Sequence, residues 1–336
     1  MTRIGMLASA AFALLPMMAY AQSSEVVVYC SVDEEWCRAQ SEAFTRDTGI
    51  NVLMTRKSSG ETFAQIKAEG QPRGDIWWGG TGDTHLQAAQ EGLTEEYRSP
   101  MLTELQDWAL RQAETSGYRT VGIYAGGLGF GYNSNMVTEN PPACWADLLD
   151  PRFKDDIQVA NPNSSGTSYT MLATMVQLMG EDEAFDYLKK LNSNISQYTK
   201  SGSAPIRAAG TGETAIGIVF MHDAVAQAVS GAPIVTVAPC EGTGYEVGSM
   251  SIIKGGPNPE AARKWFDWAL TAAAQEIGAG ANSYQVPSNK SAATPPQAPK
   301  LSDIKLIDYD FAKYGSSDVR SALLARWDAE IGALGK

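Results

Sequence analysis

One polar turn of this chain reads Asn161-Pro162-Asn163-Ser164-Ser165-Gly166-Thr167-Ser168-Tyr169-Thr170. Ile157, Val159 and Ala160 before it predict a short buried strand, and apolar residues at helical spacing up to Met179 predict a helix after it. Ser164 or Ser165 is then the expected N-cap. The backbone N–H groups at a helix start lack partners and concentrate about half a positive charge, so an anion can bind there without a basic side chain. The turn therefore predicts either a plain helix cap or an anion-binding site.

Near the start of the chain, residues 26–29, 50–55 and 75–78 have the pattern of strands, and a polar turn follows each of these three segments. Each turn precedes a helical segment. Alternation of strand, turn and helix is typical of a parallel α/β sheet, in which ligands lie at the carboxyl ends of the strands. The groups expected to converge at that edge are Ser31, Ser59, Gly80 and Thr81.

The second half of the chain repeats this pattern. A predicted strand at 195–198 precedes a turn containing Thr199 and Ser201, and a buried strand at 216–220 ends next to His222 and Asp223. A chain of 336 residues exceeds what one core usually serves, so two domains are expected. The glycine-rich segment 126–131 suggests close backbone approach, and we predict that the chain crosses between domains near it.

The N-terminus reads as an export signal. Arg3 precedes an uncharged run from Ile4 to Met18, and Ala19-Tyr20-Ala21 has the form of a signal-peptidase site. We therefore expect a signal peptide at 1–21 and a mature protein outside the cytoplasm. Four cysteines are an even set for an oxidising compartment. They allow three pairings, of which Cys30 with Cys37 and Cys144 with Cys240 is the one predicted.

The formal net charge of −12 argues against nucleic acid and anionic membrane surfaces as partners. It would also disfavour an anionic ligand, unless local dipoles and hydroxyl groups hold that ligand while salt screens the distant carboxylates.

Enzymatic and metal sites find little support in the sequence. His222 and Asp223 are adjacent and so do not face each other as a catalytic triad requires, and no Gly-x-Ser-x-Gly motif occurs. His85, the other histidine, falls on a predicted helix and is expected at the surface. His222, Asp223 and Glu246 could bind a hard cation, bind sugar hydroxyls or be ordinary loop residues. No metal and no cofactor is expected.

The order of these segments resembles the periplasmic ferric-iron type of solute-binding protein from ABC importers and, more narrowly, its hexose-phosphate-binding branch. The segments that carry the resemblance are Val28-Tyr29-Cys30-Ser31, Asp75-Ile76-Trp77-Trp78-Gly79-Gly80-Thr81, Tyr97-Arg98-Ser99-Pro100, Ser164-Ser165-Gly166-Thr167, Ile195-Ser196-Gln197-Tyr198-Thr199-Lys200-Ser201-Gly202, His222-Asp223 and Pro239-Cys240-Glu241-Gly242-Thr243-Gly244-Tyr245-Glu246. The iron-binding relatives carry two consecutive tyrosines where this chain has Phe220 and Met221, so ferric iron is not the expected ligand.

This resemblance implies an α/β fold of the type II periplasmic binding proteins, with two lobes, a ligand cleft between them and two hinge crossover strands. The expected lobes are 22–125 with 240–285 and 126–239 with 286–336. The resemblance also implies that Ser165, Gly166 and Thr167 bind an anion and that His222, Asp223 and Glu246 contact sugar hydroxyls. The expected protein is a monomer without enzymatic activity that delivers a hexose or heptose phosphate to a permease of the inner membrane. The alternatives are a phosphonate or another phosphorylated small molecule as ligand, then ferric iron, or a periplasmic hydrolase.

Overall fold

The computed structural model describes residues 25–336, so the predicted signal peptide lies outside the described residues. The chain forms a mixed sheet in the order β2-β1-β3-β9-β4-β7-β5-β6, with β8 and β10 also paired to β4. The strands are β1 (Glu25–Cys30), β2 (Asn51–Arg56), β3 (Ile76–Thr81), β4 (Val121–Asn133), β5 (Ile157–Ala160), β6 (Ile195–Thr199), β7 (Ile216–Phe220), β8 (Ile234–Val237), β9 (Tyr245–Ile252) and β10 (Val286–Pro287).

The predicted parallel units are present, but antiparallel strands connect them. β1 is parallel to β2 and β3, and β5 is parallel to β6 and β7. β9 is antiparallel to both β3 and β4. The α/β class predicted from the sequence is confirmed, as a mixed rather than a wholly parallel sheet.

Strand β4 passes from one half of the molecule to the other. Its first part, 121–127, pairs with β9, and its second part, 128–132, pairs with β7. The crossover predicted at the glycine-rich segment therefore exists. A Cβ on Gly126 would lie 2.5 Å from Nδ1 of His222, so glycine at this position allows the crossing strand to approach that side chain.

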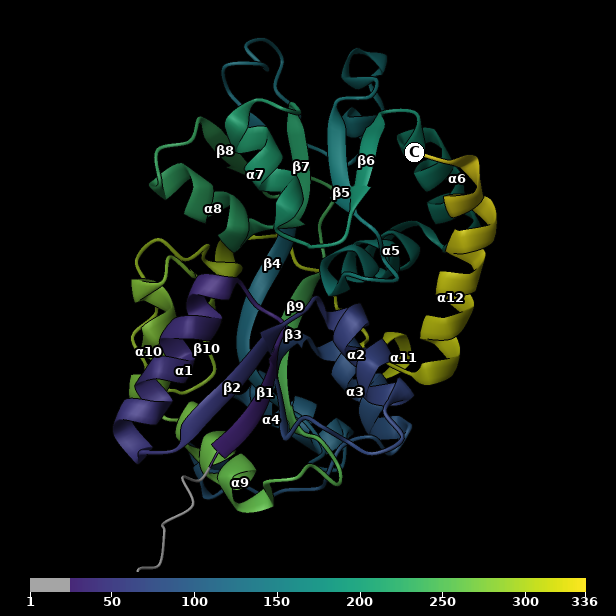
Figure 1. The fold of residues 1–336 in the computed structure, drawn as a ribbon. Coiled ribbons are helices and arrows are strands. Elements are labelled where there is room, and N and C mark those ends of the chain that lie inside the picture. The colour runs from purple at the N-terminus through teal and green to yellow at the C-terminus, as the bar shows by residue number, and fades with distance from the viewer. Residues whose placement is uncertain (1–24) are drawn as a thin grey trace, which may run out of the picture.

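Each half has its own hydrophobic core, and Figure 1 shows the two halves one above the other. The first lobe, in the lower half, contains β1–β3, β9, β10 and the first part of β4, with a core built on Trp36, Trp78 and Trp265. The second lobe, in the upper half, contains β5–β8 and the rest of β4, with a core built on Trp145 and Tyr169.

Helices cover the sheet in both lobes. Those of the first lobe are α1 (Glu34–Thr48), α2 (Ser59–Ala68), α3 (Gly82–Gln90), α4 (Asp107–Thr115), α9 (Pro259–Ala269) and α10 (Ala272–Gly280). Those of the second lobe are α5 (Gly166–Met179), α6 (Glu181–Asn192), α7 (Ala204–Thr211) and α8 (Met221–Val229), and the chain closes with α11 (Phe311–Tyr314) and α12 (Ser317–Glu330). No helix among residues 25–336 is both long enough and apolar enough to cross a membrane.

Helix α12 runs along one side of both lobes (Figure 1). At its start, Ser317 donates to Glu91 at 2.7 Å and Arg320 donates to Gln87 at 2.9 Å, both partners being in or next to α3. Towards its end, Glu330 accepts an ion pair from Lys189 of α6 at 2.6 Å. The C-terminal helix therefore contacts both lobes.

The lobe limits given above stay a prediction, and one pairing bears on them. Val286 of β10 pairs with Ala125 in the first sheet, and Tyr309 belongs to the second core. The chain thus leaves the part of the sheet in the first lobe after residue 287.

Both predicted disulfides are present. Cys30, at the end of β1, is bonded to Cys37 in α1, and Cys144 is bonded to Cys240 in the loop after β8. The first joins a strand to the helix that follows it, and the second closes a loop of 96 residues in sequence separation.

Candidate functional site

A cavity of about 50 Å³ lies where the two lobes meet. All the predicted site residues except Thr199 and Ser201 line it, namely Ser31, Ser59, Gly80, Thr81, Ser165, Gly166, Thr167, His222, Asp223 and Glu246. Strand ends from both lobes therefore meet at one place, as the sequence pattern predicted.

Six helices begin at this cavity. Their N-cap residues are Asp33 for α1, Ser58 for α2, Thr81 for α3, Ser165 for α5, Ser203 for α7 and Phe220 for α8, and every one of them lines the cavity. Each helix start contributes partial positive charge and backbone N–H groups without intrahelical partners. The side chains of Thr81 and Ser165 make no cap hydrogen bond to a backbone N–H of their own helices, and the Thr81 hydroxyl lies 3.1 Å from that of Thr84 in α3. The cavity is thus suited to an anion without needing a lysine.

The polar turn at residues 161–170 has the predicted form. Ser165 is the N-cap of α5, and Gly166 is the first helical residue. A Cβ on Gly166 would overlap Oγ1 of Thr81 from the first lobe, and the N–H of Gly60 donates to the carbonyl of Ser164 at 2.9 Å. The lobes are therefore in direct contact around the turn, and only glycine leaves room for this closed arrangement.

His222, Asp223 and Glu246 form a buried cluster in the same cavity. Nε2 of His222 lies 3.6 Å from Oδ1 of Asp223 and 3.8 Å from Oε1 of Glu246, too far for good hydrogen bonds. Nδ1 of His222 is buried without a partner. The three side chains hence keep their hydrogen-bonding capacity for a ligand.

Burial favours the neutral form of each side chain in this cluster. It lowers the pKa of His222 to about 4. Burial raises the pKa of Asp223 well above its usual value, and the negative charge of Asp33 raises it further. Burial also raises the pKa of Glu246 well above its usual value, and the negative charge of Asp223 adds to this shift. A protonated carboxyl can both donate and accept hydrogen bonds. The acids therefore repel an anionic ligand less than their number suggests, and they are suited to hydroxyl groups.

Several lining residues were not predicted from the sequence. They are Asp33, Arg56, Ser58, Tyr124, Ser203 and Gln285, together with Val32, Gly202 and Phe220. Asp33 and Arg56 stand at strand ends like the predicted residues, so the same rule would have found them. Tyr124 lies within β4 and Gln285 just before β10, where no sequence signal marks them.

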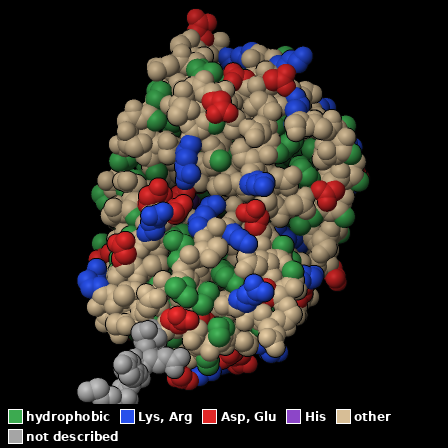
Figure 2. Space-filling view, viewed as in Figure 1, with side chains coloured by type: hydrophobic (Ala, Val, Ile, Leu, Met, Phe, Trp, Pro, Cys, Tyr) green, Lys and Arg blue, Asp and Glu red, His purple; other side chains and the backbone are tan. Residues whose placement is uncertain are grey.

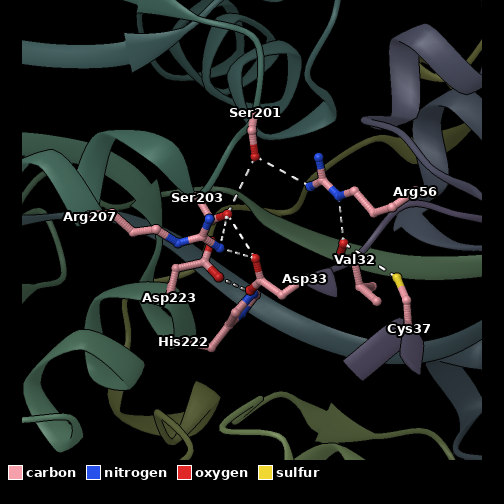
Figure 3. A network of polar contacts seen from close by, with 9 residues as sticks. All are labelled: Val32, Asp33, Cys37, Arg56, Ser201, Ser203, Arg207, His222 and Asp223. Atoms are coloured by element: carbon pink, nitrogen blue, oxygen red, sulfur yellow. Dashed lines mark hydrogen bonds and ion pairs between the residues drawn. The ribbon is translucent and has the colours of Figure 1, made fainter. Parts of the chain in front are cut away.

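Asp33 and Arg56 belong to a polar network between the lobes (Figure 3). Nε of Arg56 donates to the carbonyl of Val32 at 2.9 Å, and its Nη2 donates to Ser201 at 3.3 Å. Ser203 donates to Asp33 at 2.9 Å, and Arg207 of α7 forms an ion pair with the same carboxylate. Ser201 thus contacts Arg56 and does not line the cavity.

Thr199 does not line the cavity either. Its hydroxyl donates to the carbonyl of Ser201 at 2.9 Å. From this polar turn, Gly202 and Ser203 reach the cavity instead.

Basic side chains gather around the middle of the face shown in Figure 2, where the two lobes meet. The chain as a whole carries a net charge of −12. Local positive charge near the cleft would favour the approach of an anion to an acidic protein.

The surface position predicted for His85 is wrong. The side chain is fully buried, with its ring stacked on Trp77 at 3.7 Å between centroids. Its Nε2 donates to the carbonyl of Gly79 at 3.1 Å, and its Nδ1 accepts from Ser251 at 2.7 Å. Burial lowers its pKa to about 3, so it is a neutral core residue behind β3.

Among residues 25–336, three potential metal ligands lie close enough together to hold an ion at one place. This group consists of Cys144, Cys240 and Glu241. Because the two sulfur atoms form a disulfide, they are not thiolate ligands.

Comparison with known proteins gives the family. Residues 80–314 match the model of the bacterial extracellular solute-binding proteins. The chain belongs to this family. The family consists of binding proteins rather than enzymes. Those members that belong to ABC importers deliver their ligands to a membrane permease. The extracellular location of the family agrees with the predicted export to the periplasm.

Three relatives resemble this solute-binding protein over most of its length. An uncharacterized protein of Haemophilus influenzae is 44% identical over 312 residues, which are 91% of this chain and 90% of the relative. The periplasmic binding protein AfuA from Actinobacillus pleuropneumoniae, solved with exogenous fructose-6-phosphate bound, is 44% identical with a TM-score of 0.89, covering 92% of this chain and 99% of its own. The periplasmic binding protein P5PA is 39% identical with the same TM-score of 0.89, and the match covers 92% and 99% of the two chains.

Proposed function

We propose that the protein captures a phosphorylated sugar in the interlobe cavity and delivers it to the permease of an ABC importer. The observation that carries this proposal is the convergence of six helix starts on a cavity that also holds His222, Asp223 and Glu246. The helix starts suit an anion, and the buried cluster suits hydroxyl groups. A sugar phosphate presents both.

The phosphate is assigned to the N-terminus of α5. Gly166 and Thr167 line the cavity from the second lobe, and Ser59 and Thr81 line it from the first. Thr199 and Ser201 would support this end from behind, Ser201 through its contact with Arg56. Closure of both lobes on one phosphate explains why the site is split between them.

The sugar ring is assigned to the buried cluster. A site built around hydroxyl groups leaves its own polar atoms unpaired when a ligand lacks them, so it can discriminate strongly. The unpartnered Nδ1 of His222 is one such atom. The similarity to AfuA, solved with fructose-6-phosphate, supports a hexose phosphate in this role.

Native mass spectrometry of the protein as purified tests the proposal. A retained ligand with the mass of a hexose or heptose phosphate is the expected result. A retained phosphonate or another phosphorylated compound without a sugar would favour the alternative ligand class. Release of inorganic phosphate from an added sugar phosphate would instead indicate a hydrolase, and a bound ferric ion would reject both assignments.

A further inference from the structure

A groove lies behind the strands that cross between the lobes, on the face opposite the ligand cavity. Glu246 of β9 lines the ligand cavity, whereas its neighbours Tyr245 and Val247 line the groove. Successive side chains of a strand point to opposite faces, so the paired strands β4 and β9 separate the two spaces. Because β4 passes between the lobes at this place, bending of these strands changes the widths of both spaces.

The two walls of the groove belong to different lobes. One wall is α4 of the first lobe, in which Gln112 donates to the carbonyl of Gly82, at the start of α3, at 3.3 Å. The other wall is the segment 308–312, in which the N–H of Asp310 donates to Gln177 of α5 in the second lobe at 2.9 Å. The groove therefore lies across the connection between the lobes, with one wall fixed to each of them.

The groove is wide while the ligand cavity is almost closed. The volume of the groove is about 570 Å³, against about 50 Å³ for the ligand cavity. On the cavity side the lobes are in direct contact, since a Cβ on Gly166 would overlap Thr81. Two rigid lobes that tilt about a hinge approach each other on one side of it as they separate on the other. Opening of the ligand cavity is therefore expected to narrow the groove.

Opposite charges stand on the two walls of the groove. Arg111 lies on α4 and Asp308 on the other wall, and both side chains are exposed. Burial raises the pKa of Tyr245, Arg111 opposes this shift and Asp308 adds to it, so both charges lie near the same ring. Within residues 25–336, neither Arg111 nor Asp308 takes part in an ion pair. A narrower groove would bring the two charges together.

We propose that this groove is the contact surface of the open state, in which its two walls meet and Arg111 pairs with Asp308. Ligand affinity is then set by two opposing groups of contacts. One group, such as the ion pair of Asp33 with Arg207, holds the cavity closed, and the other holds the groove shut. The affinity observed for a ligand falls as the fraction of binding-competent protein falls. Weaker contacts in the groove should therefore strengthen ligand binding, whatever ligand the cavity takes.

Thr115→Trp tests the groove directly. Thr115 is an exposed residue of α4 that lines the groove, so a larger side chain has room while the groove is wide and overpacks it when the walls approach. The ligand-free variant is expected to have a smaller radius of gyration than the ligand-free wild type in small-angle X-ray scattering. Calorimetric titration with hexose 6-phosphate should show an affinity at least about fivefold higher. Glu114→Trp, at an exposed position of the same helix that does not line the groove, is the matched control and should change neither quantity.

Arg111→Glu tests the charged pair without adding bulk. It places a negative charge opposite Asp308, so the walls repel each other when the groove narrows. The affinity for hexose 6-phosphate should rise about 1.4- to fivefold, and the rise should shrink at high salt. Arg111→Lys keeps the positive charge and should bind as the wild type does.

Three results would overturn this role of the groove. They are a ligand-free Thr115→Trp protein as extended as the wild type, an equal effect of Glu114→Trp, and, should Thr115→Trp fail to fold, equal affinities of Arg111→Glu and Arg111→Lys. The scattering measurement needs no ligand. If Thr115→Trp makes the ligand-free protein more compact but neither it nor the wild type binds hexose 6-phosphate, the role of the groove stands and the proposed function is rejected.

Discussion

The carboxylate of Asp33, at the start of α1, forms an ion pair with the guanidinium group of Arg207 in α7, and this contact joins the two lobes beside the ligand cavity (Figure 3). Ser203, the N-cap of α7, donates to the same carboxylate at 2.9 Å. An open cleft would separate these groups. The pair therefore stabilises the closed state, which a captured ligand requires.

Arg207→Ala is expected to weaken ligand binding only modestly. The side chain of Arg207 is 51% exposed, and exposed ion pairs contribute about 0.2 to 1 kcal/mol, so the affinity should fall about 1.4- to fivefold. Arg38→Ala is the control, because it removes an exposed ion pair with Glu34 inside α1. Calorimetry on both variants measures the effect, and equal affinities would show that the interlobe pair does not contribute to closure.

Gly166→Ala should impair ligand binding without unfolding the protein. Its Cβ would overlap Oγ1 of Thr81 in the other lobe, so the strain arises only when the lobes close. Overpacking of this kind costs about 1 to 3 kcal/mol, or roughly five- to 150-fold in affinity. Gly70→Ala, where nothing lies within 4 Å of the added Cβ, is the matched control. An unchanged affinity in Gly166→Ala would place the ligand away from this contact.

Glu246→Gln should bind a hexose phosphate better than Glu246→Ala does. Burial raises the pKa of Glu246, which favours the neutral carboxyl group, and the glutamine amide, like that group, can both donate and accept hydrogen bonds. The alanine variant leaves a ligand hydroxyl unpaired and should lose about 1 to 3 kcal/mol. Titration with inorganic phosphate distinguishes the roles, since that affinity should stay the same. An equal loss for both ligands would mean that Glu246 supports the fold rather than the sugar.

Because of His85, the free energy of unfolding of the protein is expected to fall in acid. Its folded pKa of about 3 lies below the ordinary value of 6.5, so the unfolded chain binds the proton first. The contribution of this residue is complete above pH 6.5 and is lost as the pH falls towards 3. Denaturant unfolding at pH 7.5 and pH 5 measures it, with His85→Gln as the reference. The wild type should lose more stability than the variant between these values, whereas parallel losses would contradict a buried neutral His85.

The sequence pattern identified those site residues that follow the ends of strands. Ser31, Ser59, Thr81 and Ser165 follow strands, and parallel strand ends meet at one edge whatever the distant contacts are. Which other residues line the cavity depends on how the two lobes close on each other. Ser203 lines the cavity in place of Ser201 because the start of α7 turns towards Asp33.

Other positions had no local signal at all. Tyr124 reaches the cavity through the register of an antiparallel strand, and Gln285 through the segment that returns to it. His85 is buried because α3 lies against Trp77, a contact that the helical pattern of its neighbours does not encode. Tertiary packing, rather than local propensity, fixes these three residues.

The central claim is that one cavity binds a phosphate at its helix starts and a sugar at its buried cluster. Calorimetric titration of the wild-type protein with hexose 6-phosphate, the same hexose without phosphate, and inorganic phosphate tests it most directly. The account predicts that hexose phosphate binds at least about 100-fold more tightly than either fragment, because only the whole ligand satisfies both ends of the cavity and closes the lobes. Equal affinity for the hexose with and without its phosphate, or for inorganic phosphate and hexose phosphate, would contradict it.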